Sequence, residues 1–109
     1  IIDGYEAQSL GVEGVVARIR ERVGQGPAYL TFDIDAIDPA FAPGTGTPVA
    51  GGLTSAQALR MVWGLRGLDF RGMDIVEVSP PYDHADATAI AGAAVAQHYI
   101  QMLALRKAG

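Results

Sequence analysis

Hydrophobic positions along the 109-residue chain change their spacing several times, and each change predicts a new element of secondary structure. Near the beginning, apolar residues recur at helical spacing, which predicts an amphipathic surface helix that ends at Gly24 and Gly26. The apolar positions of this helix are Val12, Val15, Val16, Ile19 and Val23. Over residues 28–35 apolar and polar side chains alternate, which is the period of a strand. This pattern places Asp33 and Asp35 together on one face, at the carboxyl end of the strand.

A long loop, residues 38–53, follows the first predicted strand. Proline and glycine are too frequent there for either a helix or a strand, and loops of this length commonly have a function. A second helix should begin at Thr54, because Thr54 and Gln57 have the spacing of a capping box. Gly67 is expected to end it.

The alternating pattern returns over residues 73–79, which predicts a second strand with Glu77 near its end. A final helix could be capped by Asp83 or Asp86 and extends to about Leu105. The order α, β, α, β, α predicts an α/β fold with a parallel sheet and flanking helices. In such sheets ligands bind beyond the carboxyl ends of the strands, which is where the acidic residues fall.

Composition and charge exclude several classes of partner. The formal net charge is -4 and the basic residues are scattered singly, so no surface for a nucleic-acid backbone is predicted. Cysteine is absent, which leaves oxygen or imidazole ligands for any metal. No apolar run approaches the roughly 20 residues needed to cross a bilayer. We therefore expect a cytoplasmic protein without nucleic-acid or membrane partners.

Asp33 and Asp35 are the first candidate site residues. On one strand their Cα atoms would lie about 7 Å apart, and a divalent cation would relieve the repulsion between their carboxylates. Oxygen ligands of this kind suit manganese, magnesium or calcium. The competing interpretation is that both acids cap backbone N–H groups of the following turn, and the pair alone does not separate the two.

Glu77 and His84 carry further candidate chemistry. Glu77 could form a buried salt bridge, or it could bind a planar guanidinium group, whose paired N–H donors match a carboxylate. His84 could contact substrate or move a proton, because imidazole titrates near neutral pH. Its position between Asp83 and Asp86 is equally typical of a helix start.

Two blocks of sequence resemble one known family. The segments FDIDAIDP (residues 32–39), GTGTP (44–48) and GGLT (51–54) resemble the ureohydrolases, which include arginases and agmatinases. The segment VEVSPPYDHAD (76–86) is similar to the corresponding part of agmatinases and related amidinohydrolases. The order and spacing of the blocks agree with the family over most of the chain from residue 28 onward.

The resemblance implies a fold, a reaction and a set of roles. The fold would be part of a three-layer α/β/α domain, and the reaction would be hydrolysis of an agmatine-like guanidino compound to urea and an amine. Asp33 would bridge two manganese ions and Asp35 would bind one of them, with a metal-bound water as the nucleophile. Glu77 would receive the guanidinium, with Thr47 in the substrate loop and His84 as a further substrate contact.

The resemblance also implies that part of the site is absent. The family draws further metal ligands from two upstream segments, neither of which occurs here, and the chain opens at Ile1 in mid-pattern. We therefore expect residues 1–109 to be the C-terminal portion of one ureohydrolase domain without its N-terminal portion, inactive in isolation. The parent is expected to be a homo-oligomer. Two alternatives are a non-catalytic ureohydrolase-like module and an α/β binding domain whose acids hold one structural cation.

Overall fold

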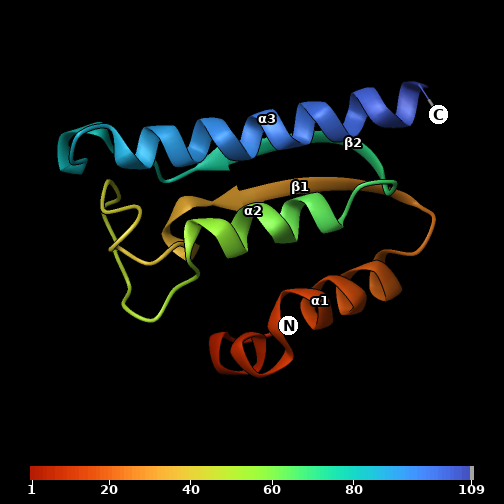
Figure 1. Ribbon diagram of the computed structural model, residues 1–109, viewed down its shortest axis with the longest axis horizontal. Coiled ribbons are helices and arrows are strands. Elements are labelled where there is room, and N and C mark those ends of the chain that lie inside the picture. The colour runs from red at the N-terminus through yellow and green to blue at the C-terminus, as the bar shows by residue number, and fades with distance from the viewer. Residues whose placement is uncertain (109) are drawn as a thin grey trace.

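The computed structural model describes residues 1–108, which form three long helices and a two-stranded sheet (Figure 1). In chain order the elements are α1 (Gly4–Val23), β1 (Pro27–Asp33), the 3-10 turn η1 (Ile34–Ala36), α2 (Ser55–Gly64), β2 (Asp69–Val76), the 3-10 turn η2 (Pro80–Tyr82) and α3 (Ala87–Ala108). None of the helices within residues 1–108 is long and apolar enough to cross a membrane. The predicted α/β alternation is confirmed.

The two strands pair in parallel, as the element order predicts. Their register places Leu30 opposite Met73 and Asp33 opposite Val76. Side chains of β1 alternate between exposed and half-buried positions, so one face of the sheet is covered and the other is open. The covered face packs against a core in which α2 and α3 meet β2. The buried members of this core are Val62, Leu65, Leu68, Phe70, Val95, Tyr99 and Met102.

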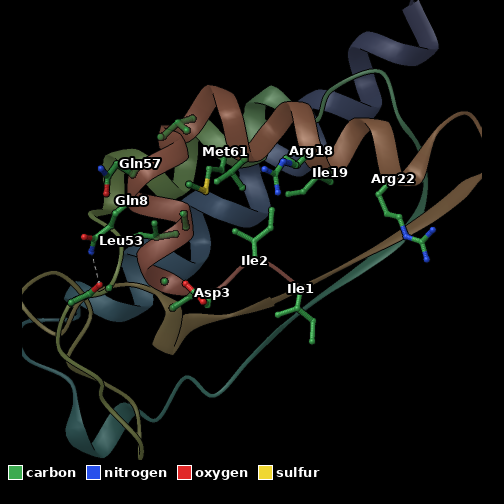
Figure 2. Close-up of a pocket in the computed structure, with 18 of the residues that line it drawn as sticks. Ile1, Ile2, Asp3, Gln8, Arg18, Ile19, Arg22, Leu53, Gln57 and Met61 are labelled. Atoms are coloured by element: carbon green, nitrogen blue, oxygen red, sulfur yellow. Dashed lines mark hydrogen bonds between the residues drawn. The ribbon is translucent and has the colours of Figure 1, made fainter.

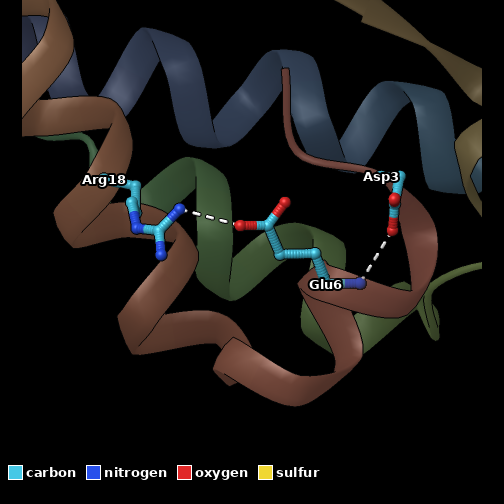
Figure 3. A network of polar contacts seen from close by, with 3 residues as sticks. All are labelled: Asp3, Glu6 and Arg18. Atoms are coloured by element: carbon cyan, nitrogen blue, oxygen red, sulfur yellow. Dashed lines mark hydrogen bonds and ion pairs between the residues drawn. The ribbon is translucent and has the colours of Figure 1, made fainter.

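The first helix is longer than its sequence pattern predicts. Asp3 caps it by accepting the N–H of Glu6 at 2.8 Å, and Gly24 ends it as expected, with φ 64°. Gly11, at φ 69°, breaks the regular helix, so the helical spacing that begins at residue 12 marks only the second part. An ion pair of 2.8 Å between Arg18 and Glu6 spans the two parts (Figure 3).

Both predicted strands differ from the observed ones at the end that carries the acids. The first ends at Asp33, and Asp35 lies in η1, so the prediction that both carboxylates share one strand face is wrong. The cause is local: a carboxylate oxygen of Asp33 accepts the N–H of Asp35 at 3.1 Å and turns the chain. The second strand begins earlier than predicted, at Asp69, and it ends at Val76 because Glu77 adopts a φ of 69° that no strand accommodates.

The last two helices follow their local signals. Thr54 and Gln57 form the predicted capping box, with both hydrogen bonds at 3.0 Å. The helix α2 ends at Gly64, and Gly67, at φ 92°, instead makes the turn into β2. Asp83 rather than Asp86 caps α3, since its carboxylate accepts backbone N–H groups of the first turn.

Candidate functional site

The carboxyl ends of β1 and β2 bring three acidic side chains to one edge of the sheet. Asp33 lies opposite Val76, so Glu77, which follows Val76, lies at the same end of the sheet as Asp33. Asp35 lies in the turn directly after Asp33. Partial burial raises the pKa of the Asp33 carboxyl, and the negative charges of Asp35 and Glu77 raise it further, against the opposing hydrogen bond from the Asp35 N–H. Three carboxylates therefore interact at the place where the sequence predicts a site.

Glu77 has a backbone conformation that residues other than glycine rarely adopt. Its φ of 69° lies in the left-handed region, which costs a residue with a Cβ about 1–2 kcal/mol. Residues held in this region cluster at ligand-binding and catalytic sites, because the surrounding structure has to enforce them. The conformation directs the chain away from β2 immediately after the last paired residue.

Thr47 joins this group from the long loop. Its hydroxyl donates a hydrogen bond of 2.8 Å to a carboxylate oxygen of Asp35. The contact brings the predicted substrate loop over the carboxyl end of β1. The structure thus places Asp33, Asp35, Thr47 and Glu77 in one region, and these are four of the five residues that sequence analysis singles out.

The two ends of the loop are tied together by Asp38. Its carboxylate accepts the backbone N–H groups of Ala40 and Gly51 at 2.9 Å and of Gly52 at 3.2 Å, and these bonds, that of Ala40 foremost, lower its pKa. A Cβ added at Gly52 would lie 2.6 Å from the Asp38 nitrogen. Backbone bonds between Asp38 and Leu53 and between Leu53 and Ala36 complete the closure. The loop therefore begins and ends at a fixed point beside η1.

The middle of the loop is tied to the segment after β2. Gly44 donates its N–H to the buried hydroxyl of Thr88 at 2.7 Å, and its carbonyl accepts the N–H of Ser79 at 2.7 Å. Burial alone would raise the pKa of Asp83, but hydrogen bonds from Thr88, Ala89 and His84 lower it to about 2. No spacing in the sequence points to the contact between Gly44 and Thr88, which joins residues 44 positions apart.

His84 is not brought into contact with the acidic group. Its backbone N–H donates to Asp83 at 2.9 Å, which agrees with the helix-start interpretation, and its side chain is exposed. Within residues 1–108 its ring takes part in no hydrogen bond or ion pair. A substrate contact by His84 stays a prediction.

The donor atoms suit a hard divalent cation, but their number does not complete a site. Asp33 and Asp35 offer carboxylate oxygens from one turn, and a cation there would offset the charge repulsion among the three acids. Across the part of the chain that the structure describes, no three histidine, aspartate or glutamate side chains are grouped so as to hold a metal ion. This segment thus provides the donor chemistry for part of a metal site.

A cavity lies elsewhere in the molecule. It has a volume of about 850 Å³ and opens between α1 and α2, and residues 51–53 at the end of the long loop also line it (Figure 2). Its lining is mainly apolar and includes Ile2, Ile19, Leu53 and Met61. None of Asp33, Asp35, Thr47 and Glu77 lines it. This cavity is therefore separate from the candidate site.

Several known proteins are similar to this chain in sequence. Residues 1–101 match the arginase family. The agmatinase of Proteus mirabilis is 53% identical over 107 residues, which are 98% of this chain and 35% of the relative. The chain thus spans about a third of the length of the curated relatives it matches.

Two solved structures share the fold of the whole segment. A hypothetical agmatinase from Burkholderia thailandensis has a TM-score of 0.96 and 55% sequence identity, with 99% of this chain and 34% of that one covered. The proclavaminate amidino hydrolase from Streptomyces clavuligerus has a TM-score of 0.92 and 44% identity, with 94% of this chain and 34% of that one covered. These likenesses confirm the α/β fold that the sequence predicts.

Proposed function

This chain belongs to the arginase family, and from that premise we propose that residues 1–109 are the C-terminal portion of a ureohydrolase domain. The longer polypeptide hydrolyses a guanidino compound of the agmatine type to urea and an amine. The lengths support the proposal, because nearly all of this chain matches only 35% of an agmatinase. A cytoplasmic location and a homo-oligomeric assembly belong to the same proposal.

The observation that carries the function is the meeting of three carboxylates and one hydroxyl at the ends of β1 and β2. In this proposal Asp33 and Asp35 hold manganese, and the remaining ligands come from the other two thirds of the polypeptide. Bound manganese supplies Lewis acidity, which activates water at neutral pH. Thr47 fixes one oxygen of Asp35 and so orients that carboxylate.

In this proposal Glu77 recognises the guanidinium group of the substrate. A carboxylate accepts two parallel hydrogen bonds from a planar guanidinium, which fixes the plane of the group as well as its position. The left-handed backbone at Glu77 sets the direction from which the carboxylate approaches. The guanidinium carbon would then lie between Glu77 and the ligands Asp33 and Asp35. His84, which follows η2 and has an exposed side chain, is a further substrate contact in this arrangement.

The test is urea release by the full-length protein. We expect the protein purified with manganese to release urea from agmatine, and we expect removal of the metal by a chelator to abolish the release. Glu77→Gln keeps the size of the side chain but removes the charge, so the KM for a cationic guanidine should rise about 10-fold or more. Failure to release urea from agmatine and from a panel of guanidino acids and amines would overturn the proposal.

A non-catalytic arginase-like module is the second candidate. The lack of three grouped metal ligands within residues 1–108 fits this candidate as well as it fits the first. The two candidates differ in manganese content. A catalytic parent should hold two ions per polypeptide, whereas a non-catalytic module should hold none after dialysis, as metal analysis would measure.

A further inference from the structure

We infer that Thr88 and Asp83 are positioning residues that fasten the substrate loop, residues 38–53, to the segment carrying Glu77. The inference rests on the proposed function, since it assigns the two residues to the same site. Neither side chain touches the carboxylates of Asp33, Asp35 or Glu77 through a hydrogen bond. Their effect on the site passes through one glycine in the middle of the loop.

Gly44 is the meeting point of three segments. Its N–H donates to the Thr88 hydroxyl at 2.7 Å and its carbonyl accepts the Ser79 N–H at 2.7 Å. Thr88 has no exposed surface and Gly44 is buried, so water cannot replace these bonds without opening the structure. One residue of the loop is thus bonded through its N–H to the start of α3 and through its carbonyl to the segment after β2.

Asp83 fixes the first turn of α3, from which the Thr88 hydroxyl reaches the loop. A lone pair of that hydroxyl accepts the Gly44 N–H. The Asp83 carboxylate lies against the same glycine, since a Cβ added at Gly44 would meet its Cγ at 2.9 Å. The same carboxylate accepts the N–H of Thr88 at 2.9 Å and of Ala89 at 3.1 Å, which fixes it relative to the helix.

Packing at Gly44 leaves no room for an alternative position. A Cβ added there would lie 2.9 Å from Cβ and Cγ of Asp83 and 2.9 Å from the Thr88 hydroxyl oxygen. Real Cβ atoms do not approach other heavy atoms this closely, so the loop already lies at its closest approach. Hydrogen bonds and packing therefore fix the same point.

Thr47 and Glu77, which we assign to the substrate site, lie close along the chain to the bond between Gly44 and Ser79. Thr47 is three residues after Gly44 and reaches Asp35, and Glu77 is two residues before Ser79. Glu77 is thus held between its strand pairing at Val76 and the Ser79–Gly44 bond. This double attachment gives a physical cause for its left-handed backbone, which would otherwise relax.

Thr88→Val tests the inference, because it keeps the shape of the side chain and removes the hydroxyl, and Thr88→Ser restores the hydroxyl. In the full-length protein we expect Thr88→Val to speed hydrogen exchange at residues 44–47 and 77–79 about 10-fold or more. Exchange in α2 should change little. The kcat/KM for a guanidino substrate should fall about 10- to 100-fold, mainly through KM, because misplacement of the groups that bind substrate weakens productive binding. Thr88→Ser should recover most of both effects.

Thr31→Val is the matched control, since the Thr31 hydroxyl bonds to Asp74 on the open face of the sheet, away from the loop. It should leave exchange at residues 44–47 and 77–79 unchanged. If Thr88→Val does not fold, Asp83→Asn is the second variant, and it should produce a smaller rise in exchange in the same two segments. Uniform faster exchange throughout the protein, or none in those segments, would overturn the inference. The exchange result decides the matter even if the wild-type protein releases no urea.

Discussion

The hydroxyl of Thr47 donates to the carboxylate of Asp35 at 2.8 Å, across a separation of 12 residues. This bond connects the loop to the carboxyl end of β1, so the loop position and the orientation of a proposed metal ligand depend on each other. Carboxylates that bind metals are commonly oriented by such outer hydrogen bonds. The proposed site is therefore sensitive to residues that bind neither metal nor substrate.

Loss of the Thr47 hydroxyl should weaken manganese binding. We expect Thr47→Val in the full-length protein to lower the manganese affinity about 10- to 100-fold, as is typical when an outer partner of a metal ligand is removed. Thr47→Ser keeps the hydroxyl and should bind manganese within about threefold of the wild type. Metal titration measures both values. Equal affinities for the valine and serine variants would contradict the role of this bond.

The backbone conformation of Glu77 should lower the stability of the protein, while its carboxylate serves substrate binding. Glycine adopts φ 69° without steric cost, so Glu77→Gly should be more stable than Glu77→Ala by about 1 kcal/mol. Both variants lack the carboxylate and should bind a guanidinium poorly. Denaturant unfolding measures the stability difference, and substrate titration measures the loss of binding. An alanine variant at least as stable as the glycine variant would show that Glu77 is not strained.

Gly52 should tolerate no side chain. A Cβ there would lie 2.6 Å from the Asp38 nitrogen and 2.8 Å from the Ala36 carbonyl oxygen, both of them backbone atoms that cannot move aside. We expect Gly52→Ala to lower the free energy of unfolding by about 1–3 kcal/mol or more. Gly26→Ala is the control, because nothing lies within 4 Å of its Cβ position. Thermal unfolding of the two variants should separate them clearly.

Asp83 should make stability depend on pH in the acid range. Its pKa is about 2 in the folded protein against an ordinary value of 3.8, so the unfolded chain binds more protons between these values. Its contribution to stability is therefore fully present above about pH 4 and is lost as the pH falls towards 2. Asp83→Asn should flatten the dependence of unfolding on pH in this window. An identical pH profile for the variant and the wild type would contradict the low pKa.

Features determined by neighbouring residues could be predicted from the sequence. The capping box of Thr54 and Gln57 depends on residues three positions apart, and the alternation along β1 follows from burial of one face. The acidic group at the carboxyl ends of the strands was also predicted, because parallel strands end on the same side. These elements agree with the structure because no distant contact opposes their local preference.

Some features that depend on hydrogen bonds between particular residues were predicted wrongly or not at all, although capping of a backbone N–H by Asp33 was one of the two interpretations of that residue. Asp35 continues the alternating pattern of the strand, yet the Asp33 carboxylate captures its N–H and makes a turn. The polar spacing around Glu77 is that of a strand, but its backbone is fixed by attachments on either side. The Gly44–Thr88 bond joins residues 44 positions apart, and no periodicity carries information about such a pair.

The free edges of the sheet affect how this segment could be moved between genes. Within residues 1–108 it has two strands, so each has a hydrogen-bonding partner on one side only, and one face of the pair carries the exposed side chains of Tyr29 and Thr31. Free strand edges favour pairing with foreign strands. A gene fusion that moved this segment alone would therefore transfer the acidic residues together with an aggregation hazard. Recombination should preserve these strands only alongside the neighbours that cover them.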